Sequence, residues 1–301
     1  MNAIFDAPDN LAVIDDEDEA APAPLAVTLA SGYVTTADGA RLYYERNAAP
    51  RGGPTLVIVN NYFMTAVQWR QFVGDLRSKY SVVAYDLRNQ GRSTACEGEL
   101  GIAQHVEDLR ALLDGLGLER AVLMGTCIST LMVVEFALKY PARTEKLVLV
   151  GSVLNPLGYR AHDFLHRSLL ASLRAGGAEA LFDHYYPLLY TARTIQAWGT
   201  PGYLVSKSRF LDNNAPEQLE KHLAGSVKLK FDCERLRQVD VPTLFIAGED
   251  DFMTRPSIVS LQVRRMRRAR SAVIPNAGHN PYIESPAEFQ NAVYGFMREE
   301  E

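Results

Sequence analysis

The chain has 301 residues, and its 47% hydrophobic and 22% charged residues are ordinary values for a globular protein, so a sizeable core is possible. A net charge of -5 gives no sign of a nucleic-acid partner. Three scattered cysteines form neither a disulfide framework nor a CxxC zinc motif, and their odd number fits a reducing compartment. Because the sequence shows no signal-peptide pattern and no apolar run of about 18 residues, we expect a cytoplasmic protein without a membrane span.

Residues 1–25 contain seven acidic residues and no Lys or Arg, and we expect them to form a disordered acidic tail. From about residue 32, strand-like apolar runs alternate with stretches of helical periodicity. The predicted strands are 32–36, 41–46, 55–59, 81–85, 121–124, 146–150, 243–247 and 271–274. The predicted helices are 66–78, 104–114, 128–139 and 286–298.

Strands that alternate with helices pair in parallel, so the pattern predicts an α/β fold with a mostly parallel central sheet and helices on both faces. The alternation stops between residues 154 and 239, where helical patterns and many aromatic residues predominate. Since strands resume afterwards, we interpret 154–239 as a helical cap. It would be inserted into one core made of residues 26–153 and 240–301.

A candidate nucleophile stands where a predicted strand runs directly into a predicted helix. The segment reads Gly125-Thr126-Cys127-Ile128-Ser129, with a small residue two positions either side of Cys127. A turn this tight holds its central residue in a strained conformation and leaves no room for bulky neighbours. The N-terminus of the following helix stabilises a thiolate and the negative charge of an acyl intermediate. We therefore predict that Cys127 is the catalytic nucleophile.

Two later strand ends supply candidate partners for Cys127. The segment Gly248-Glu249-Asp250-Asp251 follows one strand, and Gly278-His279 follows the next. The order nucleophile, acid, histidine is one that catalytic triads use. His279 would accept the thiol proton, and the acid would orient the imidazole. The spacing Gly-x-x-Asp favours Asp251, with Asp250 as the alternative.

An acyl intermediate also needs two backbone N–H donors for its oxyanion. The first is expected at Ile128, directly after the nucleophile. The second is expected in the turn after strand 55–59, where we choose Tyr62 with Phe63 as the alternative. Asn60 and Asn61 stand in this turn in place of the usual His-Gly pair.

Together these motifs resemble those of the α/β-hydrolase superfamily over residues 32–298. The segment Asp86-Leu-Arg-Asn-Gln-Gly91-Arg-Ser93 is similar to the Asp-x-Arg-Gly-x-Gly-x-Ser turn of that family. Cysteine nucleophiles occur there in polyhydroxyalkanoate synthases, dienelactone hydrolases and some thioesterases. The turn Val59-Asn60…Thr65-Ala66 also looks like that of the bacterial 3-hydroxyacyl-carrier-protein transacylases, which have serine at the elbow.

The resemblance implies acyl transfer or hydrolysis of an acyl thioester through a Cys127 acyl-enzyme with a Cys-His-Asp triad and no cofactor or metal ion. The thioester would be bound to coenzyme A or an acyl carrier protein, and the aromatic cap suits a lipid-like or polyketide-like chain. The alternative is a hydrolase of a small ester or lactone, and a third hypothesis is a non-enzymatic use of the fold. The arginine-rich run 264–270 is either a docking patch for an acidic carrier protein or a solvated helix face.

Overall fold

The protein is described by a computed structural model that covers residues 29–47, 53–98 and 100–299. The predicted acidic tail, residues 1–25, therefore lies outside the described residues. Within the covered ranges, none of the helices combines the length and the apolar character needed to span a membrane.

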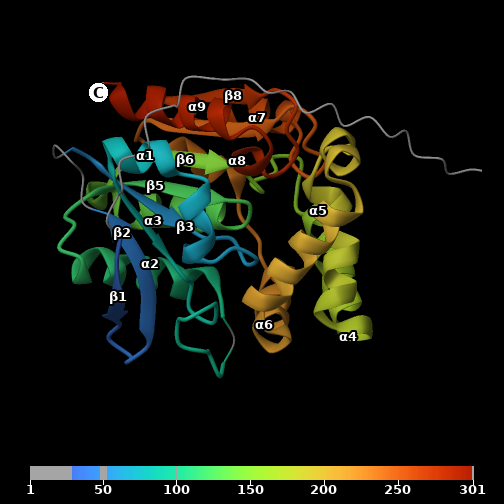
Figure 1. Ribbon diagram of the computed structural model, residues 1–301. Helices are drawn as coiled ribbons and strands as arrows, with labels where there is room; N and C mark the ends of the chain where they lie inside the picture. Colours follow the sequence, from blue (N-terminus) through green and yellow to red (C-terminus); the bar gives the residue numbers. More distant parts are fainter. Residues whose placement is uncertain (1–28, 48–52, 99, 300–301) are drawn as a thin grey trace, which may run out of the picture.

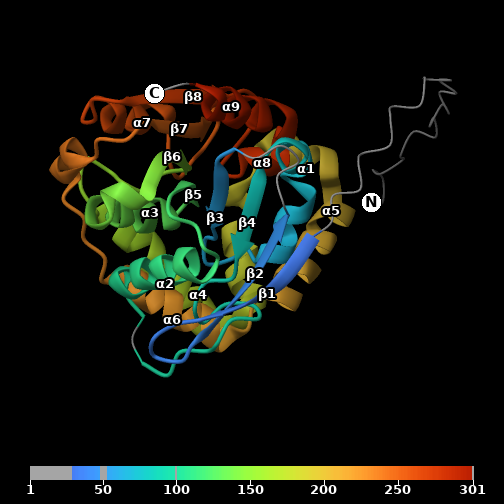
Figure 2. The same ribbon diagram turned by 90° about the vertical axis from the view of Figure 1, so that its left-hand side faces the viewer.

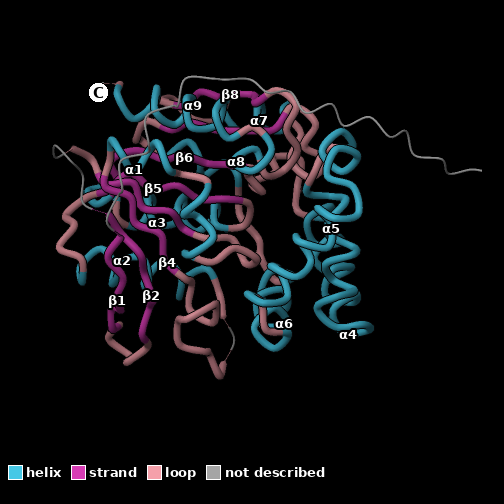
Figure 3. Tube along the Cα trace, viewed as in Figure 1, coloured by secondary structure: helices cyan, strands magenta, loops and turns pink. Residues whose placement is uncertain are grey.

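An eight-stranded sheet forms the middle layer, in the order β1-β2-β4-β3-β5-β6-β7-β8 (Figures 1 and 3). Only β2 runs opposite to its neighbours, β1 and β4, and the other adjacent pairs are parallel. The strands are β1 (Leu29–Thr35), β2 (Arg41–Asn47), β3 (Thr55–Val59), β4 (Ser81–Tyr85), β5 (Ala121–Thr126), β6 (Thr144–Val150), β7 (Thr243–Gly248) and β8 (Ala269–Ile274). This mostly parallel α/β arrangement confirms the predicted fold class.

Helices cover both faces of the sheet because the central strands are apolar on both sides. Val57, Leu123 and Leu149 pack on the face covered by α2 (Ile102–Gly115), α3 (Ser129–Lys139) and α7 (Pro256–Val263). Their neighbours Ile58 and Met124 pack on the other face, beneath α1 (Gly74–Lys79) and α9 (Pro286–Arg298). Figure 2 shows these two helical layers on either side of the strands.

The structure corrects one predicted helix. In place of a continuous helix over 66–78, a short 3-10 helix, η1 (Ala66–Gln71), precedes α1. The Thr65 N–H donates to the Gln68 side chain (2.7 Å) and fixes the start of η1. Gly74 has a low helix-forming tendency, so the apolar spacing through this stretch does not suffice to keep one helix continuous.

Three α-helices lie between β6 and β7 in the chain and stand to the right of the sheet in Figure 1. They are α4 (Arg160–Leu189), α5 (Ala192–Asn213) and α6 (Pro216–Val227), all within the range 154–239. Their shared core contains Leu181, Phe210 and Leu223. The remaining short helices are η2 (Pro141–Arg143), η3 (Cys233–Gln238) and α8 (Pro281–Glu284).

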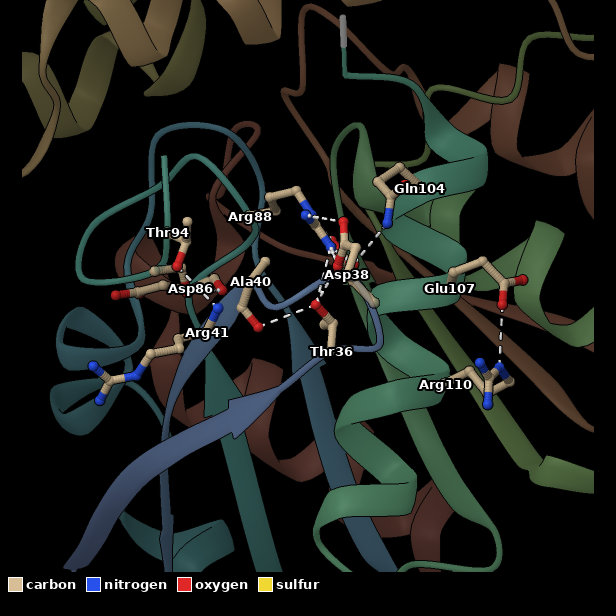
Figure 4. Close-up of polar contacts among 12 residues, drawn as sticks. Thr36, Asp38, Ala40, Arg41, Asp86, Arg88, Thr94, Gln104, Glu107 and Arg110 are labelled. Atoms are coloured by element: carbon tan, nitrogen blue, oxygen red, sulfur yellow. Dashed lines mark hydrogen bonds and ion pairs between the residues drawn. The ribbon is translucent and has the colours of Figure 1, made fainter. Parts of the chain in front are cut away.

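A buried ion pair fastens the loop after β4 to the rest of the core (Figure 4). The Arg88 guanidinium donates to both carboxylate oxygens of Asp108 in α2, at 2.8 and 2.6 Å, and also to Asp38 in the β1–β2 turn. The side chains of Arg88 and Asp108 are 9% and 1% exposed. The same loop carries Gln90, whose amide donates to the Asn61 carbonyl (2.7 Å), so the ion pair also supports the turn after β3.

We predict that Arg88→Met lowers the free energy of unfolding by about 3–5 kcal/mol, because it leaves the Asp108 carboxylate buried without its cation. The measurement is urea unfolding followed by circular dichroism. Arg110→Met is the matched control, since Arg110 pairs with Glu107 and Asp114 at the surface and should contribute less than about 1 kcal/mol. Equal losses in the two variants would contradict the assigned role of Arg88.

Candidate active site

Cys127 occupies the tight turn between β5 and α3. Its φ angle is 52°, in the left-handed region that side chains other than glycine rarely adopt. Its N–H donates to the Val150 carbonyl at 2.8 Å. A Cβ added to Gly125 would lie 2.6 Å from the Ser129 carbonyl oxygen, so the small residue expected there is required by contact.

Ser129 does more than leave space for the turn. Its Oγ accepts the Thr126 N–H (2.7 Å) and donates to the Val59 carbonyl (2.7 Å). The hydroxyl therefore ties the turn that carries Cys127 to the end of β3. An alanine at 129 would be small enough but would lose both hydrogen bonds.

His279 and Asp251 come together at the ends of β8 and β7. His279 Nδ1 lies 2.9 Å from Asp251 Oδ2, and both side chains are buried. The second oxygen of Asp251 accepts the N–H groups of Met253 and Thr254, each at 2.8 Å. Asp250, the alternative acid, is exposed, so the structure places Asp251 rather than Asp250 against the imidazole.

Charges around His279 favour its protonated form. Burial works against the imidazolium, but the Asp251 carboxylate and the Cys127 thiolate outweigh it and raise the pKa of His279 to about 10. Burial would also raise the pKa of Asp251, yet the positive charge of His279 and the hydrogen bonds to this carboxylate hold it below its usual value. The pair can therefore hold a proton taken from the thiol of Cys127.

Gly151, at the end of β6, is a site residue that the sequence analysis missed. Its φ is 57°, and an added Cβ would lie 2.7 Å from His279 Cε1. Any side chain at 151 would therefore displace the imidazole. The only sequence signal was a glycine directly after a strand end, which is common at ordinary turns as well.

The two expected oxyanion donors, Ile128 and Tyr62, line a cavity that also contains Cys127 and His279. Within the part of the chain that the structure describes, no acceptor binds the N–H of Tyr62 or Ile128. The N–H of Phe63, the alternative donor, is taken by Asn61 Oδ1 at 2.9 Å. Asn61 Nδ2 in turn donates to Thr126 Oγ1 (3.2 Å), on the residue before Cys127. The unusual Asn61 thus shapes the turn and leaves the Tyr62 donor available.

The cavity, which is partly open to solvent, has both Cys127 and His279 in its lining. Its walls come from strand ends on one side and from α4 on the other. They are mostly apolar, with contributions from Ile128, Val153, Leu165, Leu169, Leu188, Phe252, Met253 and Ile258. Among the described lining residues there is no Lys, Arg, Asp or Glu.

Two histidines of α4, His162 and His166, also line this cavity. The sequence analysis gave them no role because neither follows a strand-end glycine. Their spacing of four residues puts both on one helix face, and this was the signal that could have found them. The described residues contain no group of three or more His, Cys, Asp or Glu placed to hold a metal ion.

The arginine-rich run 264–270 does not form a helix face. It begins where α7 ends and continues into β8. Arg265 pairs with Glu234, Arg267 with Asp240 and Arg270 with Glu299. These ion pairs occupy much of the charge that a docking patch would need, and docking of an acyl carrier protein stays a prediction.

The family model described as the alpha/beta hydrolase family matches residues 52–292. The chain therefore belongs to the alpha/beta hydrolase family, and it is an enzyme of the hydrolase type. Its sheet order, its strand-turn-helix at Cys127 and its inserted helices are the structural counterpart of that match.

Individual relatives cover most of the chain. It is 26% identical over 274 residues to 3-oxoadipate enol-lactonase 2 of Acinetobacter baylyi. This alignment covers 88% of this chain and 96% of the relative. It is 27% identical over 271 residues to a protein of Azorhizobium caulinodans provisionally named carbamate hydrolase RutD, across 86% and 96% of the two chains. A solved hydrolase from Pseudomonas aeruginosa superposes with a TM-score of 0.78 at 26% identity, over 89% of this chain and 98% of that one.

We predict that Asp251→Asn slows catalysis about 10³- to 10⁴-fold, whereas Asp250→Asn changes it by no more than about twofold. The reason is that only Asp251 contacts His279. Steady-state rates on one ester test the first claim. An NMR titration should also show a lower pKa for His279 in Asp251→Asn, because the carboxylate charge that raises it is lost. An inactive Asp250→Asn variant together with an active Asp251→Asn variant would overturn the assignment of Asp251 as the acid that orients His279.

Proposed function

We propose that the protein hydrolyses small esters or lactones through an acyl-enzyme formed on Cys127, with His279 as the base and Asp251 as the group that orients it. The observation that carries this proposal is the shared cavity: the strained Cys127 and the buried His279, hydrogen-bonded to Asp251, open onto one largely apolar space. A nucleophile, an oriented base and two available N–H donors are the parts that acyl chemistry needs.

In the proposed reaction, His279 Nε2 takes the thiol proton and Cys127 Sγ attacks the substrate carbonyl carbon. The carbonyl oxygen becomes an oxyanion that accepts hydrogen bonds from the Ile128 and Tyr62 N–H groups. The C–O bond then breaks, and His279 returns its proton to the departing alcohol, or to the freed hydroxyl of an opened lactone. A water molecule, deprotonated by His279, then attacks the carbonyl carbon of the thioester. The C–S bond breaks, His279 returns the proton to Cys127 Sγ, and the acid is released.

Two findings support small esters or lactones over carrier-bound thioesters. The curated relatives include an enol-lactonase matched along nearly its whole length, and none of the relatives described above has a name that refers to a carrier protein. Three of the five arginines in the run 264–270, which could have docked an acidic carrier, pair with acidic residues of the chain instead. A hydrolase of a small acyl substrate accounts for both findings.

Acyl transfer is a second candidate, favoured by one observation. A thioester intermediate reacts readily with alcohols, amines and thiols, whereas water needs activation. The described cavity wall offers no carboxylate to hold a water, so its activation would depend on His279, the same base that serves Cys127. If the enzyme is a transferase, adding an alcohol or thiol acceptor should accelerate decay of the acyl-enzyme well above its rate in buffer.

We predict that Cys127→Ala loses turnover of simple esters by roughly ten-thousandfold or more, because the attacking atom is gone. The rates are measured on a panel of small esters and lactones, and circular dichroism checks the fold. Cys96→Ala is the matched control, since Cys96 lies outside the cavity, and it should keep the wild-type rate. Activity retained in Cys127→Ala would remove the basis of the proposal.

A further inference from the structure

His162 and His166 form a polar pair on the largely apolar wall of the active-site cavity. They lie one helical turn apart on α4, and their rings stack with centroids 3.9 Å apart and 27° between planes. Both line the cavity that also contains Cys127 and His279. His166 is only 6% exposed, and His162 is half-buried beside it.

Neither ring has a hydrogen-bond partner in the described ranges of the chain. His162 Nε2 and His166 Nδ1 are fully enclosed, whereas the second nitrogen of each ring, His162 Nδ1 and His166 Nε2, stays accessible. Other histidines of the inserted helices are bonded: His184 Nδ1 lies 2.7 Å from Ser172 Oγ, and His222 Nε2 lies 3.0 Å from the Asn89 carbonyl. A buried polar ring without a partner is costly unless a ligand or water supplies one.

The electrostatics of the cavity restrict which ligand group could serve. Burial lowers the pKa of His162 to about 4 and the pKa of His166 well below its usual value, so both rings are neutral near pH 7. A neutral imidazole offers one donor and one acceptor. Because no Lys or Arg stands among the described lining residues and the protonated His279 is already paired with Asp251, a carboxylate would lose its hydration without gaining a free cation. A hydroxyl, amide or carbonyl group fits instead.

We propose that His162 and His166 form a subsite for a neutral hydrogen-bonding group of the substrate. The preferred substrates are then small esters or lactones that carry a hydroxyl, amide or carbonyl group in addition to the reacting carbonyl. This inference rests on the proposed function, because it assigns the pair to the cavity in which Cys127 would act. His162 and His166 are specificity-determining residues in this account and take no part in proton transfer.

The test compares esters of similar length by acid release in a pH-stat. Butyl hexanoate is the plain substrate. Butyl 3-hydroxyhexanoate and butyl 6-hydroxyhexanoate carry a hydroxyl in the acyl part, 4-hydroxybutyl hexanoate carries it in the alcohol part, and monobutyl adipate carries a carboxylate. The wild-type enzyme should prefer at least one hydroxylated ester over butyl hexanoate by about tenfold or more in kcat/KM, and should disfavour monobutyl adipate.

Variants assign the preference to the pair. His162→Leu and His166→Leu should lose the preference, measured as the ratio of kcat/KM for the hydroxylated ester to kcat/KM for butyl hexanoate. Circular dichroism checks that both variants fold. His162→Asn and His166→Gln place an amide near the accessible nitrogen and should keep part of the preference. His184→Leu, beyond the kink in α4 at Gly176 and Gly177 and outside the cavity lining, should keep all of the preference.

Binding to the Cys127→Ala protein, measured by calorimetry with the same esters, separates the subsite from the chemistry. Tighter binding of a hydroxylated ester that is lost with His166→Leu supports the subsite, even if no ester is turned over and the proposed function fails. Turnover of butyl hexanoate with no preference for a hydroxylated ester, a preference for monobutyl adipate, or a preference that survives both leucine variants would each overturn the inference.

Discussion

The turn at Cys127 is the constraint to which the rest of the site is fitted. A left-handed cysteine between a strand and a helix is strained, and it persists only because the surroundings determine it. Those surroundings are specific: Gly125 touches the backbone of Ser129, and the Ser129 hydroxyl bonds both this turn and the end of β3. Because the Cys127 N–H also donates to the Val150 carbonyl in β6, hydrogen bonds to three strands, β3, β5 and β6, keep this turn in its strained conformation.

Parallel pairing explains why the other groups arrive at the same place. The carboxyl ends of β3, β5, β6, β7 and β8 meet at one edge of the sheet, and the loops that follow them carry Tyr62, Cys127, Gly151, Asp251 and His279. The inserted helices then cover the space above this edge, where α4 contributes one wall of the cavity that contains Cys127. In the proposed function, the core supplies the reacting groups and the insertion supplies the wall that selects the substrate.

Local sequence patterns predicted the strands of the sheet, although they merged η1 and α1 into one helix. The strand-turn-helix around Cys127 and the spacing Gly-x-x-Asp predicted the places of Cys127 and Asp251, because tight turns allow few residues at fixed offsets. The choice between Tyr62 and Phe63 needed coordinates, since it depends on the Asn61 side chain that occupies the Phe63 N–H. The sequence analysis assigned no role to His162 and His166 for a similar reason, because their role depends on which face of α4 lines the cavity. Helix periodicity gives that face only after the partner surface is known.

The central claim, an acyl group carried on Cys127, is tested most directly by trapping that intermediate. The enzyme is mixed with an ester that it hydrolyses, quenched in acid within milliseconds, digested with trypsin and sequenced by mass spectrometry. The account predicts that peptide 121–139 gains the mass of the acyl group, that fragmentation places it on Cys127, and that neutral hydroxylamine removes it, as expected of a thioester. An acyl group on a serine, on Cys96 or on Cys233, or steady turnover with Cys127 unmodified throughout, would contradict it.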